Sequence, residues 1–282
     1  MTELKQHIVR AVRSIRADLA NPPYAAPGHY YSPRTSPDDV ARAIANRRPP
    51  VGVDMNEAGQ VELASALRFE IPPVRRWTTS GNTMFGPADA SILRAMIKHY
   101  APRRFVEVGS GFSTAVALDM AEEAYPELQI TCVEPYADRL RSRLRAGDDQ
   151  RLTLIERPVQ SVKPSELVSG LAAGDIFFID STHVVKGGSD VCHLILHTLP
   201  LIPVGVAVHL HDIFWPFEYS DEWLTEGRDW TESYLLQAFL AHNDAWKITM
   251  FGSWLWEHHP ELAAPGTAQE MPGSIWLERV SG

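Results

Sequence analysis

The amino-acid sequence predicts an α/β fold, with a mostly parallel sheet and helices on both faces, from three observations. From about residue 87 onward, short β-branched runs alternate with helical patterns, as is typical of βαβ units. A glycine-rich turn joins the first of these runs to a helix. Two later runs are continuously apolar and end in ionisable residues, as parallel strands buried on both faces do.

The alternation defines the expected elements in order along the chain. Strands are expected at 104–108, 129–133, 152–155, 175–179, 205–211, 245–251 and 274–279. Helices are expected at 87–100, 113–123, 136–146, 164–172, 189–199 and near 230–242. The Pro-rich segment 48–86 shows no regular pattern, and we assign no element to it.

Residues 1–80 are predicted to form a helical, Pro-rich extension, and residues 81–282 the main domain. An amphipathic helix over 1–20 is predicted by an apolar stripe of Leu4, Ile8, Val12, Ile15 and Leu19. A second helix over 36–47 is predicted to begin with Ser36 as its cap and Pro37 at its first position. The extension has two interpretations, a lid over the substrate or a contact in a homodimer.

Composition narrows the class of partner. The net charge of −9, with 35 acids against 26 Lys and Arg, argues against a nucleic-acid partner, because phosphate binding needs a basic face. No run approaches the ~20 apolar residues of a membrane span. Cys132 and Cys192 have no metal-like spacing and are interpreted as small hydrophobic side chains in a reduced compartment. We therefore expect a cytoplasmic protein without a membrane or nucleic-acid partner.

The glycine-rich turn begins at the end of the first predicted strand. In Glu107-Val-Gly109-Ser110-Gly111 the glycines let backbone amides approach a ligand at the start of a helix. A dinucleotide fingerprint needs a third small residue, and Thr114 stands at that position. The other interpretation is a tight turn in a generic α/β domain.

A second acid supports a cofactor site. Glu134 ends the second predicted strand, 23 residues after Gly111, where a carboxylate can hydrogen-bond both ribose hydroxyls of a nucleotide. The spacing fits a nicotinamide or an adenosyl cofactor. The alternative is an acid exposed at a strand end.

Ionisable residues also follow two later strands. Asp180 ends one apolar run, with His183 three residues later, and His211 and Asp212 end another. Because ligands bind at the carboxyl ends of the strands in open α/β sheets, these side chains are expected at the mouth of the site. His209 shares a face with His211, and we interpret it as a structural residue.

These motifs resemble the class I S-adenosylmethionine-dependent methyltransferases from about residue 80 to the end. The resemblance lies in Phe105–Thr114, Phe178–His183, His209–Tyr219 and Gly273–Leu277. It implies a Rossmann-like, seven-stranded sheet with an antiparallel last strand, and S-adenosylmethionine as cofactor. It implies that the cofactor is bound by Glu107, Gly109, Ser110, Gly111, Ser113, Glu134, Pro135, Val159, Asp180 and Ser181.

The sequence is similar, more distantly, to metal-dependent catechol-type O-methyltransferases. That resemblance implies a divalent ion at Asp180, His211 and Asp212, and a base at the position of His183. The chain departs from that pattern twice, with His for the usual Lys base and His-Asp for Asp-Asn. Imidazole can serve as base and as ligand, so the ion is left open among Mg, Mn, Fe and Zn.

The resemblance implies O-methylation of a small-molecule acceptor, with Asp180, His183 and His211 as catalytic residues. Two routes stay open: a metal that binds the acceptor oxygen, or direct proton removal by His183 or His211. Aromatic residues in 214–230 are expected either to wall the acceptor pocket or to pack against the sheet edge, and residues 80–86 are expected to cover the cofactor.

Two further classes remain as alternatives. One is a hydroxylase of the non-haem iron type on the same fold, since such sites use two His and one carboxylate. The other is a non-catalytic binding protein. An NAD-dependent dehydrogenase is disfavoured, because the third glycine and a Tyr-x-x-x-Lys pattern are missing.

Overall fold

The computed structural model describes residues 3–26, 28–262 and 271–282. It contains two compact units, one of Met1–Arg47 with Ser220–Asp229 and one of Arg48–Tyr219 with Trp230–Gly282. The boundary predicted at residue 80 therefore lies inside the larger unit. In the described part of the chain, no helix is long and apolar enough to cross a membrane.

The smaller unit is helical. Its helices are α1 (Glu3–Ala20), α2 (Pro37–Ala45) and the short α9 (Asp221–Thr225), the last of which the sequence pattern does not predict. Ser36 caps α2 as predicted, because its hydroxyl accepts the Asp39 amide (3.2 Å) while the Asp39 carboxylate accepts the Ser36 amide (2.9 Å). Of the predicted α1 stripe, Ile8, Val12, Ile15 and Leu19 are exposed, and the Leu4 side chain lies outside the described residues.

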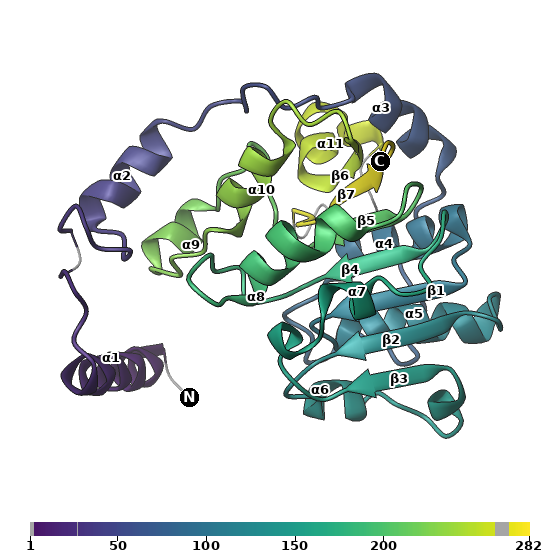
Figure 1. Cartoon of the computed structure of the whole chain (residues 1–282), viewed down its shortest axis with the longest axis horizontal. Coiled ribbons are helices and arrows are strands. Elements are labelled where there is room, and N and C mark those ends of the chain that lie inside the picture. The colour runs from purple at the N-terminus through teal and green to yellow at the C-terminus, as the bar shows by residue number, and fades with distance from the viewer. Residues whose placement is uncertain (1–2, 27, 263–270) are drawn as a thin grey trace. The chain divides into compact units, whose positions relative to one another are not determined.

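The larger unit contains a seven-stranded sheet of order β3-β2-β1-β4-β5-β7-β6 (Figure 1). The strands are β1 (Arg104–Val108), β2 (Gln129–Val133), β3 (Leu152–Ile155), β4 (Ile176–Ile179), β5 (Ala207–Leu210), β6 (Trp246–Phe251) and β7 (Ile275–Arg279). Strands β1 to β5 pair in parallel, and β7 runs antiparallel to both of its neighbours. This confirms the predicted sheet and its antiparallel last strand.

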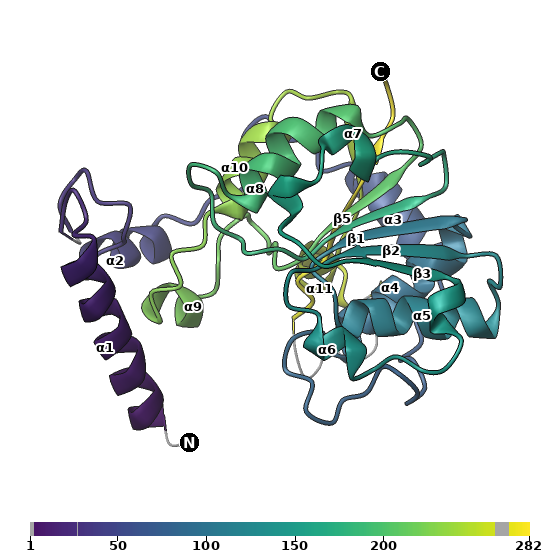
Figure 2. The same cartoon turned by 60° about the horizontal axis from the view of Figure 1, so that its bottom comes forward.

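Helices cover both faces of the sheet. On one side lie α4 (Pro87–Tyr100) and α5 (Phe112–Glu123), and on the other α7 (Pro164–Leu167), α8 (Asp190–Cys192) and α10 (Glu232–Leu240) (Figure 2). The larger unit also has α3 (Glu57–Ala66), α6 (Asp138–Arg141) and α11 (Gly252–His258). Two-sided cover explains why β4 and β5 are buried along their whole length rather than alternating.

Three predicted helices are shorter or less regular than their patterns indicate. The segment 136–146 forms only the single turn α6, and Asp148, paired with Arg76, also accepts the Arg145 amide (2.8 Å) and diverts the chain. The segment 164–172 ends after α7, near Gly170 at φ +78°. The segment 189–199 becomes α8, a π-helical turn at His193–Thr198 and a 3₁₀ turn containing Pro200, which lacks the amide needed to continue an α-helix.

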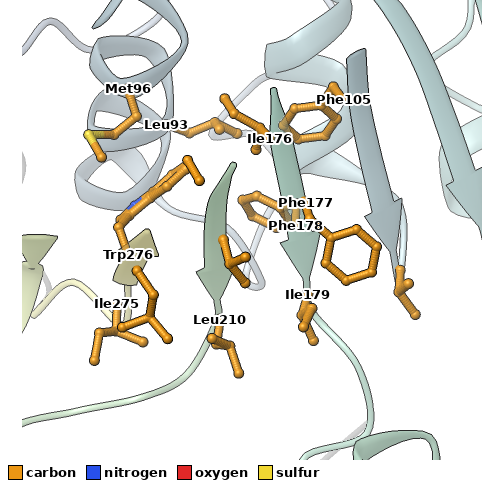
Figure 3. Packing of buried hydrophobic residues seen from close by; sticks show 14 of the residues in the cluster. Leu93, Met96, Phe105, Ile176, Phe177, Phe178, Ile179, Leu210, Ile275 and Trp276 are labelled. Carbon is orange, nitrogen blue, oxygen red and sulfur yellow. The ribbon is translucent and has the colours of Figure 1, made fainter. Parts of the chain in front are cut away.

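The core beneath the site packs aliphatic side chains against several aromatic rings (Figure 3). The Phe178 ring lies 5.6 Å from the Phe105 ring and 6.3 Å from the Trp276 ring, measured between centroids. His209 stacks on Phe178 at 3.9 Å and 14°, and burial holds its pKa well below the ordinary value. His209 is thus a neutral ring of the core, and both of its ring nitrogens are buried without a hydrogen-bond partner in the described structure. Its interpretation as a structural residue stays a prediction.

Candidate active site

The glycine-rich turn connects β1 to α5 and touches the end of β4. Gly109 has φ +81°, and a Cβ there would lie 1.7 Å from the Asp180 carbonyl oxygen. Its amide donates to the Val133 carbonyl at the end of β2 (3.0 Å). Only glycine combines this backbone conformation with this close approach, so Gly109 brings the ends of three strands together.

Glu107 lies fully buried beneath the turn. Its carboxylate accepts hydrogen bonds from the hydroxyls of Ser113 and Thr114 in the first turn of α5. Burial raises its pKa to about 7, against the effect of these hydrogen bonds. Thr114 also accepts the Gly111 amide through its hydroxyl (3.1 Å), so the residue that breaks the dinucleotide fingerprint has a bonding role in this turn.

Glu134 lies beside the same turn. Its carboxylate accepts the Ser110 amide (3.2 Å) and the Tyr136 amide (2.7 Å), which positions the acid at the mouth of the turn. Contact of Glu134 with a ribose stays a prediction, as does any contact of its neighbour Pro135. Val159, in a 3₁₀ turn after β3, has its side chain in the hydrophobic core.

Two hydroxyls near the turn are buried without a hydrogen-bond partner in the described structure. They belong to Ser110 in the turn and Ser181 directly after β4. A buried hydroxyl left unpaired costs free energy, so such groups point to a ligand or water that completes them. These residues and Glu134 fit a cofactor with hydroxyl, amino and carboxylate groups.

Asp180, His183 and Asp212 come together where β4 and β5 end. The His183 Nε2 atom lies 3.6 Å from Asp180 Oδ1 and 3.5 Å from Asp212 Oδ2. His183 and Asp212 both have positive φ, +60° and +57°. Non-glycine residues adopt this conformation rarely, and they do so most often where surrounding contacts hold them in a functional geometry.

His211 lies next to this group. Its Nε2 atom is 3.7 Å from Asp212 Oδ1, and its ring is 5.1 Å from the ring of Phe85. Its Nδ1 atom is buried and has no hydrogen-bond partner in the described structure. The structure thus places the predicted residues Asp180, His183, His211 and Asp212 in one cluster.

The residues of this cluster shift one another's pKa values. Burial lowers the pKa of His183, but the nearby carboxylates of Asp180 and Glu232 outweigh burial and hold that pKa well above the ordinary value. Burial raises the pKa of Asp180, and the nearby imidazoles of His211 and His183 outweigh it and lower that pKa. The pKa of Asp212 is raised by burial. Near neutral pH, His183 is therefore a cation beside an ionised Asp180.

Glu232 was not predicted from the sequence. Its Oε2 atom lies 2.8 Å from His183 Nδ1, and its side chain is buried at the start of α10. In the sequence it is an acid in the first turn of a helix. Acids are common there because their negative charge interacts favourably with the helix dipole. Nothing in the sequence indicates that it meets a residue 49 positions earlier.

The predicted metal site is not matched by a suitable group of ligands in the described structure. Within residues 3–26, 28–262 and 271–282, no three or more His, Cys, Asp or Glu side chains are arranged to hold a metal ion. Instead, the His183 imidazole lies between the two carboxylates that were expected to bind one. The residues in this arrangement do not fit a resident divalent ion.

The aromatic insertion is mostly core. Phe214, Phe217 and Tyr219 are buried, whereas Trp215 and Trp230 are half-buried. The Trp230 ring lies 4.5 Å from the His183 ring and is the aromatic group nearest the cluster among those described. Trp230 is thus the residue of the insertion best placed to border an acceptor.

The predicted cofactor lid is anchored at both ends. Trp77 is fully buried, and its indole N–H donates to the Phe85 carbonyl (3.1 Å), while Phe85 packs on His211. Between these anchors most of the segment is exposed, including Met84. A covering role for residues 80–86 stays a prediction.

The chain is similar to several known proteins. Residues 106–213 match a family described as a methyltransferase domain. An uncharacterised protein of Archaeoglobus fulgidus is 30% identical over 154 residues, 48% of this chain and 69% of that protein. Among solved structures, the chain resembles the O-methyltransferase from Bacillus cereus in complex with SAH (16% identity, TM-score 0.49, 79% of this chain and 89% of that one). It also resembles the O-methyltransferase TomG from Streptomyces achromogenes in complex with SAM (16% identity, TM-score 0.47, 82% and 92%).

Three observations point to the same class of protein: the sheet order, the glycine turn at the end of β1 and the matched family. The chain belongs to the class I S-adenosylmethionine-dependent methyltransferases.

Proposed function

We propose that the enzyme transfers the methyl group of S-adenosylmethionine to a hydroxyl oxygen of a small molecule, with His183 as the base. One observation carries this proposal: the His183 Nε2 atom faces Asp180 and Asp212 at the strand ends, beside the glycine turn. A general base must lie where the acceptor proton is lost, and this is the mouth of the sheet.

The cofactor, when bound, supplies a methyl group already activated by the sulfonium. The chain then has two tasks, to align an acceptor oxygen with that methyl group and to remove its proton. The Gly109–Gly111 turn and Glu134 would hold the cofactor, and His183 would take the proton at Nε2. The positive charge of the cofactor opposes the neighbouring carboxylates and lowers the pKa of His183, which favours its basic form.

The remaining predicted residues have supporting roles in this proposal. Asp180 stabilises the imidazolium that forms when His183 takes the proton, since its carboxylate stays ionised. His211 is the alternative base, because its imidazole lies beside Asp212 in the same cluster. Trp230 supports an acceptor with an apolar ring, because its ring borders His183.

Methyl transfer from isotope-labelled S-adenosylmethionine tests the proposal, with catechol, an aliphatic alcohol and a primary amine as probe acceptors. We expect label in the hydroxyl acceptors, and a kcat lower by about 100- to 10,000-fold in His183→Ala with unchanged affinity for S-adenosylhomocysteine. Label only in the amine would contradict O-methylation. No binding of S-adenosylhomocysteine at millimolar concentration would contradict the cofactor assignment.

A divalent metal at Asp180, His211 and Asp212 is the alternative, and we favour the metal-free route because the His183 imidazole lies between the Asp180 and Asp212 carboxylates. After dialysis against EDTA we expect the rate to be unchanged. A rate lost on dialysis and restored only by Mg²⁺, Mn²⁺, Fe²⁺ or Zn²⁺ would replace direct base catalysis with the metal route. The same result with Fe²⁺ and O₂ consumption would favour the hydroxylase alternative.

A further inference from the structure

We propose that Glu232 is a positioning residue that fixes the orientation and tautomer of the His183 ring, so that Nε2 is the atom presented to the acceptor. This inference rests on the proposed role of His183 as base. The carboxylate of Glu232 meets the opposite side of that ring, at Nδ1. Glu232 would thereby act through His183.

The contact itself sets the tautomer. Glu232 Oε2 lies 2.8 Å from His183 Nδ1, and the Glu232 side chain is 1% exposed. An ionised carboxylate can only accept a hydrogen bond, so Nδ1 carries the proton. In the neutral ring, Nε2 then has the free lone pair, and a base needs this lone pair on the side of the acceptor.

The start of α10 also holds the backbone of His183. The amides of Thr231 and Glu232 both donate to the His183 carbonyl, at 2.8 and 3.1 Å. The Val185 amide donates to the Thr231 hydroxyl (2.7 Å). These hydrogen bonds hold His183 at its positive φ, a conformation that costs about 1–3 kcal/mol and needs such support.

A purely stabilising role explains Glu232 poorly. Its second oxygen, Oε1, is buried and has no hydrogen-bond partner in the described structure, and burial raises its pKa. Buried ion pairs are often no more stabilising than apolar side chains of similar volume, because both charges lose their hydration. The contact therefore makes more sense as a constraint on the imidazole than as a source of stability.

The groups around the ring come from three elements and agree with this assignment. Asp180 follows β4 and Asp212 follows β5, and both lie on the Nε2 side. Glu232 from α10 lies on the Nδ1 side, and the Trp230 ring packs at 4.5 Å and 42° to the imidazole. The ring thus has one fixed edge and one edge that faces the strand ends.

Two measurements test the proposal, and the first needs no acceptor. Nitrogen-15 NMR of the imidazoles, assigned by comparison with His183→Ala, reports the tautomer of His183 on the alkaline side of its titration. We expect the Nδ1–H form in the wild type and a mixture of tautomers in Glu232→Ala. Glu232→Gln keeps the shape and an acceptor oxygen, and it should retain the Nδ1–H form. Glu257→Gln, an exposed acid on α11, is the control for loss of charge.

The second measurement is kinetic, with catechol as the probe acceptor. We expect Glu232→Ala to lower kcat about 10- to 100-fold with little change in KM or in the affinity for S-adenosylhomocysteine, and Glu232→Gln to recover part of that loss. In the His183→Ala background, removal of Glu232 should cause no further loss, because both residues act through one ring. If Glu232→Ala does not fold, the same comparisons are made with Glu232→Leu, whose side chain is closer in volume to that of Glu232 and cannot accept a hydrogen bond from Nδ1.

The outcomes separate the two proposals. An unchanged His183 tautomer in Glu232→Ala, or an equal loss of kcat with and without His183, would overturn the role of Glu232. Full activity of His183→Ala together with a Glu232-dependent tautomer would overturn His183 as base while Glu232 still positions the ring. Loss of methyl transfer in His183→Ala with no effect of Glu232 would overturn the role of Glu232 alone.

Discussion

The two halves of the site are built in different ways. Near β1 and β2, backbone amides and hydroxyls hold the carboxylates: Ser113 and Thr114 bind Glu107, and the Ser110 and Tyr136 amides bind Glu134. Near β4 and β5, charged side chains hold one another, as Asp180 and Glu232 hold His183.

In the proposed mechanism the two halves have different tasks. A cofactor is the same molecule in every turnover, so a preformed cradle of backbone groups suits it. Proton removal needs a group whose charge changes, and its pKa is set by neighbouring charges in a buried place. The half near β4 and β5 contains the two positive-φ residues His183 and Asp212, and it contains the histidine whose pKa is held well above its ordinary value.

The largest effect is expected where the two halves touch. Gly109→Ala would place a methyl group 1.7 Å from the Asp180 carbonyl oxygen, at a positive φ that alanine disfavours. We expect a loss of roughly 3 kcal/mol or more in the free energy of unfolding and loss of S-adenosylhomocysteine binding. Calorimetric titration and thermal unfolding measure both. Gly187→Ala is the control, because a Cβ there meets nothing within 4 Å. Unchanged binding in Gly109→Ala would show that the halves are independent.

The next prediction concerns pH and the acceptor half. Because the pKa of His183 is held well above its ordinary 6.5, its basic form becomes more abundant as pH rises. We expect kcat/KM to increase about tenfold per pH unit below that pKa and to level off above it. A rate profile with catechol measures this. A rate that falls as pH rises would contradict the assignment of His183 as base.

The third prediction concerns Glu107 in the half of the site near β1 and β2, and it tests how stability depends on pH. The pKa of Glu107 is raised from 4.5 to about 7 in the folded protein, so its contribution to stability is present below 4.5 and lost as pH rises through about 7. Glutamine cannot ionise, so the variant should gain stability relative to the wild type between about pH 5 and pH 8. Thermal unfolding at both pH values measures this difference. A difference that is independent of pH would mean that Glu107 is not the titrating group.

The smallest effect is expected at the support of α10. The Tyr219 hydroxyl accepts the Ser233 amide (3.1 Å) in the first turn of α10. Tyr219→Phe removes this hydrogen bond and should cost about 1 kcal/mol in the free energy of unfolding. Denaturant unfolding measures it, with the exposed Tyr24→Phe as control. An equal cost in both variants would remove any special role for this contact.

Strands were predictable because apolar runs and their ends are local properties of the sequence. All seven predicted strands are present, and the acids and histidines that follow β2, β4 and β5 lie at the expected sheet edge. The cradle of Gly109 and Glu134 could be predicted for the same reason. These residues are separated by one strand–helix–strand unit, and their spacing alone brings them together.

Elements that depend on distant partners could not be predicted. Helix α3 contains Gly59 and shows no apolar stripe, and it is anchored by the buried Gln60, which bonds the Met55 carbonyl and the Phe251 amide. Helix α6 is cut short beside the Arg76–Asp148 pair. Glu232 belongs to the same class, because its partner His183 is known only once α10 packs on the sheet.

The place of β7 has a consequence for the order of folding. β7 lies between β5 and β6, so β6 joins the sheet only through a strand that follows it in sequence. The two residues just before β7 contact other parts of the larger unit: the Gly273 carbonyl accepts the Ile213 amide (3.1 Å), and Ser274 donates to Asp89 on α4. Pairings of long sequence separation form late, because loop closure precedes any contact. The β1–β4 pair Phe105–Ile176 and the β5–β7 pair Ala207–Glu278 both join residues 71 positions apart. Both halves of the site therefore depend on pairings that form late in folding.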